Sequence, residues 1–362
     1  MNPETETQNP AAPIKKPKTK HIKRLKIAVA ILTVFGIALF SYLVYSVGLD
    51  SVLEGITKIG IGGFLILQLI YFLRIVFRAT AWRLSVYAPY KLDTKDTIPA
   101  VIIGEAMSSM IPLGILVSGT AKAVAVRHRI PLVVGLSSIA TENLFYSIIT
   151  GIFICLGSVV FLRNFELADA WVWTIDTLIA GIIIFMIAIV IIVIKQWHFA
   201  SNFCEWLYKR NIGKRFLESG RLQVRLFENL IYGFYRRYPK RFLPILICQV
   251  AFHLLGILEA LFILSRLRDA FPSFYTAFLL ESMSRLISVT FKFVPFVIGI
   301  DEAGAQFITE TLAVGAGVGV TLAIIRKGRI IFWSAIGLIL IARRGFSIRE
   351  FAGLKKEEKD SA

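Results

Sequence analysis

Long apolar stretches separated by shorter polar ones dominate this chain. Stretches of about 20 residues are expected to form transmembrane helices, because a helix that rises about 1.5 Å per residue then crosses the roughly 30 Å hydrocarbon core of a bilayer. The apolar stretches are residues 27–47, 61–82, 98–119, 132–162, 171–194, 242–264, 274–300, 303–325 and 330–342. We therefore predict an all-α, polytopic membrane helical bundle with about seven or eight spans.

Two of these stretches contain residues that interrupt helices. Residues 98–119 contain Pro112 and Gly114, and residues 274–300 contain Pro295 and Gly299. Proline removes a helical hydrogen bond, and glycine permits backbone conformations that end a helix. We predict that these four residues break the two segments, which then enter the membrane as broken or re-entrant helices.

Polar segments divide the chain into five parts. They are a basic cytoplasmic tail (1–26), a first membrane half (27–195), a basic connector (196–241), a second membrane half (242–342) and a polar tail (343–362). In the connector, Leu226, Leu230 and Phe234 recur at helical spacing among basic residues, which predicts an amphipathic helix lying on an anionic leaflet. No nucleic-acid motif accompanies these basic residues, so we predict no nucleic-acid partner.

Charge sets the expected orientation. The chain has 41 Lys and Arg against 24 Asp and Glu, yet charged residues make up only 18%, which argues against an ordinary soluble domain. The positive-inside rule places the N-terminus, residues 78–95, residues 122–129 and the connector in the cytoplasm. Loops 48–60 and 163–170 are then outside. We predict a multi-pass protein of the inner (plasma) membrane. Three basic residues also favour a cytoplasmic loop between the last two apolar stretches: Arg326, Lys327 and Arg329.

An internal repeat links the two membrane halves. Residues 105–111 (EAMSSMI) are similar to residues 281–287 (ESMSRLI), and a proline and a glycine follow each copy. Chance similarity between apolar segments is the alternative, but it does not explain a carboxylate and a helix breaker in both copies. Paired broken segments in corresponding halves are typical of a transporter with a binding site near the membrane midplane. We predict two pseudo-repeats.

The same segments carry a resemblance to a known family. Residues 104–122 (GEAMSSMIPLGILVSGTAK) and 294–304 (VPFVIGIDEAG) resemble the two motifs of the lysylphosphatidylglycerol synthase transmembrane region, also called the flippase-like domain family. The resemblance extends over roughly residues 25–345. Known members fuse this membrane unit to an aminoacyl-transferase domain, for which the residues after the last apolar stretch are too few, so no lysyltransferase is expected. The resemblance implies movement of a polar-headed lipid between leaflets.

Ionisable residues within apolar stretches are the candidate site, because a charge at mid-membrane costs about 2.5–3.5 kcal/mol. Glu281 and Arg285 lie four residues apart and are expected to pair on one helix face, either as a purely structural ion pair or in a cavity for a lipid headgroup. The candidates that would neutralise a phosphate are Arg285, Lys292 and Lys122. Those that would bind a cationic headgroup or relay protons are Glu105, Glu142, Glu281 and Glu302. Asp301 and Glu302 precede a helix, where capping is the competing explanation.

Other residues are given structural interpretations. Arg74, Arg78 and Arg83 are expected to extend to the membrane interface, and His253 to be a hydrogen-bonded core or cavity residue. Residues 315–319 (GAGVG) are interpreted as a close helix-packing surface rather than a nucleotide loop. The scattered cysteines and histidines predict no metal site, and no cofactor is expected.

Translocation of a phospholipid or lipid-linked intermediate is the favoured function, with membrane lipids as partners and no enzymatic activity expected. One alternative is a membrane-embedded transferase acting on a lipid headgroup or polyprenyl carrier. Another is a non-transporting scaffold that binds enzymes of envelope-lipid biosynthesis.

Overall fold

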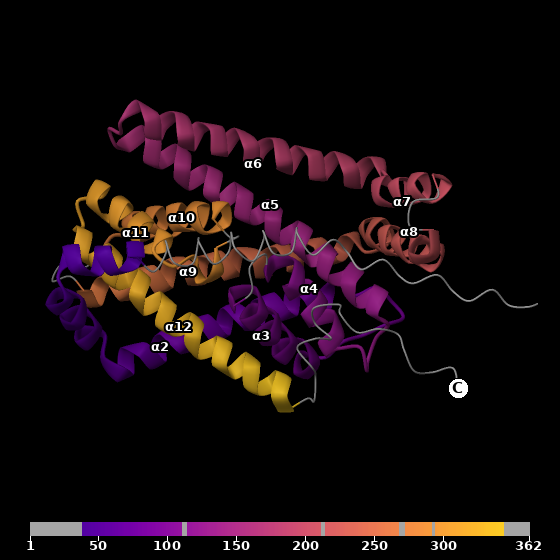
Figure 1. The fold of residues 1–362 in the computed structure, drawn as a ribbon, viewed down its shortest axis with the longest axis horizontal. Coiled ribbons are helices and arrows are strands. Elements are labelled where there is room, and N and C mark those ends of the chain that lie inside the picture. The colour runs from indigo at the N-terminus through magenta and orange to yellow at the C-terminus, as the bar shows by residue number, and fades with distance from the viewer. Residues whose placement is uncertain (1–37, 111–113, 211–213, 268–271, 292–293, 344–362) are drawn as a thin grey trace, which may run out of the picture.

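The computed structural model describes residues 38–110, 114–210, 214–267, 272–291 and 294–343 (Figure 1). The regular elements in these ranges are helices, which confirms the all-α prediction. Beyond a short apolar helix at Ala38–Val47, they are α2 (Leu49–Leu84), α3 (Thr94–Met110), α4 (Gly114–Ala125), α5 (Leu132–Asn164), α6 (Asp169–Lys195), α7 (Phe199–Lys209), α8 (Lys214–Arg237), η1 (Pro239–Arg241), α9 (Phe242–Leu267), α10 (Phe274–Thr290), η2 (Pro295–Val297), α11 (Ile300–Thr311) and α12 (Ala316–Arg343).

Four helices in the described ranges are long and apolar enough to cross a membrane: α2, α5, α6 and α9 together with η1. They contain the predicted stretches 61–82, 132–162, 171–194 and 242–264. α6 packs along α5 (Figure 1) and leaves most of its apolar side chains exposed, as expected for a surface in contact with lipid. The protein is therefore a multi-pass membrane protein. The total of seven or eight spans and the pseudo-repeats stay predictions.

α2 begins earlier than predicted. Residues 48–60 were expected to be an extramembrane loop, but helix already begins at Leu49 and continues through a kink at Gly60, where φ is 61°. The loop prediction is wrong because this segment has a buried helical face: Val52 and Ile59 are buried, and Gly55 lies against Thr321 of α12.

Both segments predicted to be broken are divided in the structure. α3 ends at Met110 and α4 begins at Gly114, while Pro112 lies outside the described residues. α10 ends at Thr290, and α11 begins at Ile300 after the short η2 helix. Gly299 has φ 81°, a conformation that favours glycine, and directly precedes α11.

The C-terminal helices differ from the prediction of separate stretches at 303–325 and 330–342. The break instead lies between Thr311 and Ala316, and α12 continues without interruption through the three basic residues that were expected to form a cytoplasmic loop. α12 can continue as one helix through these residues because they have buried carboxylate partners, described below. Gly319 fits the close-packing interpretation, since a Cβ there would overlap the Ala305 carbonyl of α11.

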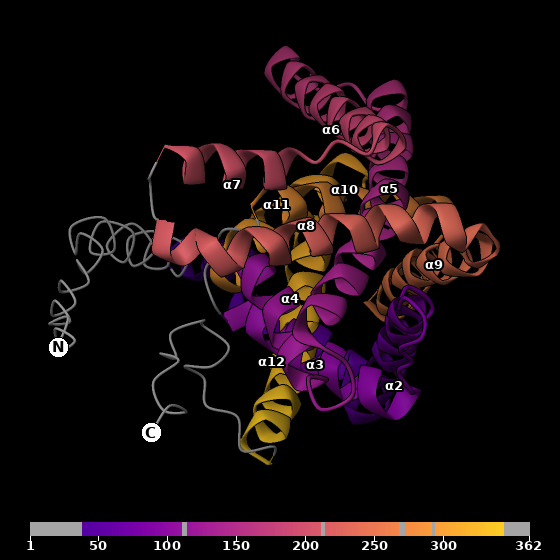
Figure 2. The same cartoon turned by 90° about the vertical axis from the view of Figure 1, so that its right-hand side faces the viewer.

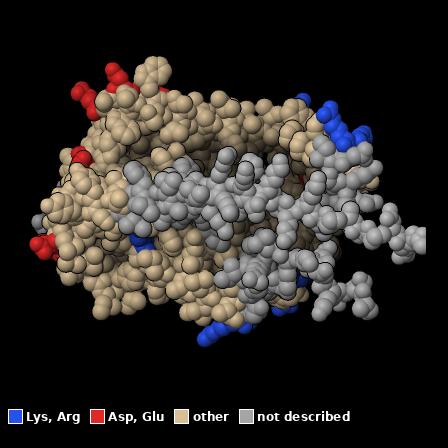
Figure 3. Space-filling view, viewed as in Figure 1, with Lys and Arg blue, Asp and Glu red and all other residues tan. Residues whose placement is uncertain are grey.

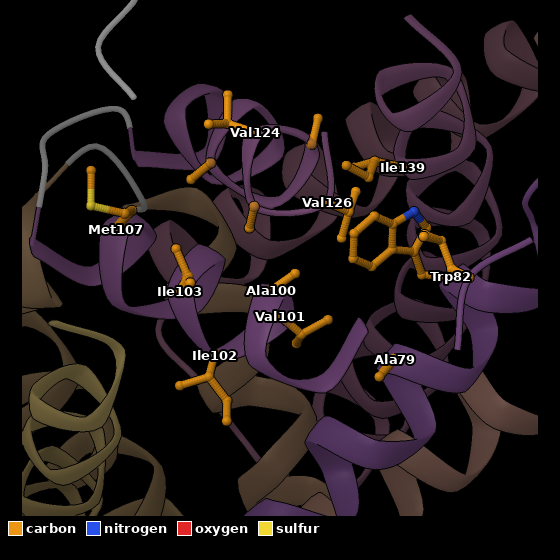
Figure 4. Packing of buried hydrophobic residues seen from close by; sticks show 14 of the residues in the cluster. Ala79, Trp82, Ala100, Val101, Ile102, Ile103, Met107, Val124, Val126 and Ile139 are labelled. Carbon is orange, nitrogen blue, oxygen red and sulfur yellow. The ribbon is translucent and has the colours of Figure 1, made fainter. Parts of the chain in front are cut away.

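A buried apolar cluster fixes α3 against its neighbours (Figure 4). Ala100 and Ile103 of α3 are fully buried in this cluster, which also contains Trp82 of α2 and Ile139 of α5. The Trp82 indole donates a hydrogen bond of 2.9 Å to Ser138 Oγ. The cluster therefore ties α2, α3 and α5 together, and this sets the position of the polar residues on α2 and α3.

The connector forms two helices at one end of the bundle (Figure 2). α8 contains the predicted helical stretch and packs on α5, with Phe234 buried and Leu226 exposed. Glu228 of α8 accepts hydrogen bonds from the first turn of α7, at 2.9 Å from Ala200 N and 2.5 Å from Ser201 Oγ. Burial and the nearby Glu228 carboxylate raise the pKa of Tyr232, which stays neutral and donates to the Trp197 carbonyl. These contacts hold α7 and α8 together.

Candidate functional site

Two buried carboxylates form the centre of an ion-pair network. Glu259 of α9 lies 3.1 Å from Arg74 Nη1 of α2 and 3.4 Å from Arg326 Nε of α12, and it also pairs with Arg329. Its side chain is 1% exposed. Because burial of a lone carboxylate is costly, Glu259 requires these guanidinium partners. The residue therefore joins α2, α9 and α12 through charge.

Glu281 of α10 is the second centre. Its Oε1 lies 2.9 Å from Arg285 Nη2 and 3.7 Å from Arg74 Nη2, and its Oε2 lies 2.6 Å from Arg326 Nη2. The predicted pair between Glu281 and Arg285 is thus present, within a larger network. Gly256 of α9 makes room for it, because a Cβ at Gly256 would lie 2.5 Å from Glu281 Oε1.

A separate group of charges surrounds Arg78 of α2. Arg78 Nη1 lies 2.9 Å from Glu105 Oε1 of α3, and Arg78 Nε lies 3.6 Å from Glu142 Oε1 of α5. Gln249 of α9 donates to Glu142 at 3.0 Å. Tyr146 packs beneath the guanidinium, with its ring centroid 4.5 Å from Arg78 Cζ. Glu105 is the more accessible carboxylate, with its side chain 26% exposed against 1% for Glu142.

Lys327 of α12 pairs with both acidic residues at the start of α11. Its Nζ lies 3.4 Å from Asp301 Oδ2 and 3.1 Å from Glu302 Oε1. Glu302 also accepts a hydrogen bond of 2.7 Å from Gly299 N, so it caps the start of α11 and pairs with Lys327 at the same time. Asp301 accepts a hydrogen bond from Ser288 Oγ at 3.2 Å.

These groups surround one cavity of about 600 Å³. Glu105 and Glu281 both line it, together with Arg285, Arg326 and Asp301. Its apolar wall includes Ile182, Phe185 and Met186 of α6. Phe185 is 58% exposed, so the cavity extends to the exposed apolar surface of α6. The face drawn in Figure 3 is hollowed below this helix.

The polar wall of the cavity uses matching positions of the two similar segments. On α3 the lining residues are Glu105, Ser108 and Ser109, and the corresponding residues of α10, Glu281, Ser284 and Arg285, line it too, beside Ile287, Ser288 and Val289 further along α10. Each set has the spacing i, i+3 and i+4 and therefore occupies one helix face. These two sets of three residues differ only at the last position, where Ser109 of α3 corresponds to Arg285 of α10.

Comparison with known proteins identifies the family of this chain. The family described as "Lysylphosphatidylglycerol synthase TM region" matches residues 25–337, nearly the whole chain. The chain belongs to this family. Neither a curated protein nor a solved structure matches it.

In this family member, the predicted site residues occupy different places around the cavity. Glu105, Glu281, Arg285 and Asp301 line it. Three others are buried in the helices around it and are not among the described lining residues: Glu142, Glu302 and Lys122. Lys122 of α4 packs against Gly104, so its aliphatic chain fills the α3–α4 contact. Lys292 lies outside the described residues.

The membrane-interface interpretation of the α2 arginines is wrong for two of the three. Arg83 is exposed near the end of α2, but Arg74 and Arg78 are directed into the protein, where carboxylates compensate their charge. Arg74 is 3% exposed. Their spacing of four residues, with Tyr71 one turn earlier on the same face, is a signal that could have placed them together.

The interpretation of residues 326–329 as a cytoplasmic loop also fails. Arg326 and Lys327 line the cavity, and Arg329 is buried beside Glu259. The sequence from 316 to 343 contains no proline and no cluster of turn residues, which is a signal for one continuous helix. Acidic residues in the other apolar stretches also require cationic partners, and Arg326, Lys327 and Arg329 are such partners.

His253 has the predicted structural role. It is buried in α9 and lies 3.0 Å from Thr150 Oγ1 of α5, stacked on Phe153. Within the described ranges, no group of three or more His, Cys, Asp or Glu side chains is arranged to hold a metal ion.

Proposed function

We propose that this protein moves a lipid with a charged headgroup, a phospholipid or a lipid-linked intermediate, between the two leaflets of the membrane. One observation carries the proposal: a cavity lined by Glu105, Glu281 and several arginines is also lined by lipid-facing residues of α6. A headgroup in the cavity would exchange water for fixed charges, while the acyl chains stay in the bilayer beside α6. The volume of about 600 Å³ is within the range of small-molecule sites.

Neutralising Glu105 tests this function with little risk to the fold. Glu105 is more exposed than Glu142, Glu259 and Glu281, the other carboxylates that pair with arginines around the cavity, and its partner Arg78 would keep Glu142. We expect Glu105→Gln to lower lipid translocation by about tenfold, since a negative charge is lost from the cavity wall and the charge-assisted hydrogen bond with Arg78 becomes a weaker bond to a neutral amide. The measurement is the rate at which a fluorescent phospholipid becomes accessible to dithionite in proteoliposomes.

Glu310→Gln is the matched control, because Glu310 lies on the exposed surface of α11. It should translocate lipid like the unmodified protein. An unchanged rate in Glu105→Gln would remove Glu105 from the mechanism. A rate in the unmodified protein no higher than that of empty vesicles would favour a scaffold. Mass spectrometry of the recovered lipid separates translocation from a transferase reaction, since a transferase changes the headgroup.

We propose that the end of the bundle with α7 and α8 faces the cytoplasm, against the anionic leaflet. Exposed basic residues gather at this end, and exposed acidic ones at the other (Figure 3). α7 adds exposed Phe199, Phe203 and Trp206, spaced to share one helix face. Aromatic residues of this kind prefer the membrane interface.

Cysteine labelling tests this orientation. Cys204 of α7 is a free, partly exposed thiol. We expect a membrane-impermeant maleimide to label it in inverted vesicles and not in spheroplasts. A cysteine introduced at the exposed Glu166, between α5 and α6, should give the reverse result. Labelling of Cys204 in spheroplasts would overturn the orientation.

A further inference from the structure

The centre of the network contains more positive than negative charge. Among the described residues, four guanidinium groups meet there around two carboxylates: Arg74, Arg285, Arg326 and Arg329 around Glu259 and Glu281. The formal charge of this group is therefore +2. All six side chains are at least partly buried, with exposures from 1% to 21%. Positive charge at this depth has to be balanced, by neighbouring carboxylates or by a bound anion.

The excess positive charge lies where a ligand can reach it. Arg285 and Arg326 are the most exposed of the four, at 21% and 14%, and both line the cavity. Each donates a hydrogen bond to Glu281 through Nη2. A guanidinium group has five N–H donors, so each keeps further donors for an anion. Ser284 also lines the cavity, and its Oγ has no hydrogen-bond partner among the described residues.

The neighbouring charges confine an anion to this centre. Arg78 with Glu105 and Glu142 has a formal charge of −1, and so has Lys327 with Asp301 and Glu302. Both groups contribute carboxylates to the cavity wall, Glu105 in one and Asp301 in the other. A phosphate near either carboxylate would be repelled. The cavity is thus positive around Arg285 and Arg326 and acidic on its flanks.

We propose that this cavity selects lipids whose phosphate group carries two negative charges, such as a phosphomonoester or a diphosphate-linked lipid, over lipids with a singly charged phosphodiester. The inference rests on the proposed lipid translocation and specifies its substrate class. A dianion matches the formal +2 of the four arginines and two glutamates at the centre, and it is attracted to Arg285 and Arg326 more strongly than a monoanion is. Guanidinium groups bind phosphate oxygens through paired hydrogen bonds, which strengthens the preference.

Binding to the purified full-length protein in detergent at pH 8 tests the selection. Dioctanoyl phosphatidic acid and dioctanoyl phosphatidylglycerol share their acyl chains and differ in headgroup charge. A phosphomonoester has a second pKa of about 6, so the phosphatidic acid carries two negative charges at pH 8. We expect the phosphatidic acid to bind about tenfold more tightly. Equal affinities for the two dioctanoyl lipids would overturn the proposal.

Variants assign the preference to this centre. Arg285→Gln should reduce the preference for phosphatidic acid to about twofold or less, because one unit of the excess positive charge is lost. Arg285→Lys should keep most of it. Arg266→Gln is the control, since Arg266 is exposed on α9 and stacks on Phe262. A preference unchanged in Arg285→Gln would overturn the assignment.

The binding comparison separates this inference from the function on which it rests. The comparison in the unmodified protein requires no variant to fold and no transport. Equal binding of the two headgroups would leave translocation standing. A protein that discriminates the headgroups and does not translocate any lipid would contradict the proposed function alone.

Discussion

Replacing Glu259 with glutamine is expected to destabilise the protein by about 3–5 kcal/mol, the cost of leaving buried charges without a partner. Glu259 is the only carboxylate in the described ranges that binds Arg74, Arg326 and Arg329 together. A neutral amide would keep the shape of the side chain and remove the charge. The expected measurement is a large fall in the midpoint of thermal unfolding in detergent, followed by tryptophan fluorescence or by size exclusion after heating.

A second substitution makes this prediction specific to charge. In Glu259→Gln with Arg329→Gln, one buried cation is removed with the anion, so part of the lost stability should return. The surface substitution Glu310→Gln should leave the unfolding midpoint unchanged. If Glu259→Gln unfolds at the same temperature as the unmodified protein, the carboxylate does not hold α2, α9 and α12 together.

Filling the cavity is expected to abolish translocation while the fold is retained. Ser108 of α3 lines the cavity and is only partly buried. A tryptophan at this position would place an indole in the space between α3 and α10, where the headgroup is proposed to pass. We expect Ser108→Trp to reduce the rate of lipid translocation in proteoliposomes to the background of empty vesicles, with a near-normal unfolding midpoint.

Thr174→Trp is the matched control, because Thr174 is exposed on α6 and does not belong to the described lining of the cavity. It should translocate lipid normally. Normal translocation by a stably folded Ser108→Trp protein would show that lipids move by another route, for instance along the outer surface of α6.

Much of the fold follows from the sequence because apolar length is a direct physical requirement for crossing a bilayer. Residues 132–162 and 171–194 illustrate this, as each contains few charges and forms one long helix. The start of α2 and the uninterrupted course of α12 could not be predicted from the sequence. Both contain charged residues at helical spacing, and the sequence alone does not show whether such charges meet water or a buried partner.

The candidate site could be predicted on its acidic side. Glu105 and Glu281 stand out because each precedes a helix breaker within an apolar stretch, and both line the cavity. The positions of the arginines do not follow from the sequence in the same way. Arg74 and Arg326 are as consistent with the membrane interface as with the interior, because long side chains reach either. Their partner Glu259 comes from a helix distant in sequence, and contacts of that kind are set by tertiary packing.

The pairing of Arg74 with Glu259 also constrains how the protein is made. The two residues are separated by 185 positions, so α2 emerges from the ribosome long before its counter-charge is synthesised. Until α9 is inserted, the Arg74 charge of α2 lacks its partner Glu259 and is unfavourable in the bilayer core. Insertion of the N-terminal helices must therefore remain reversible, or shielded by the insertion machinery, until the second half of the polypeptide completes the neutralisation.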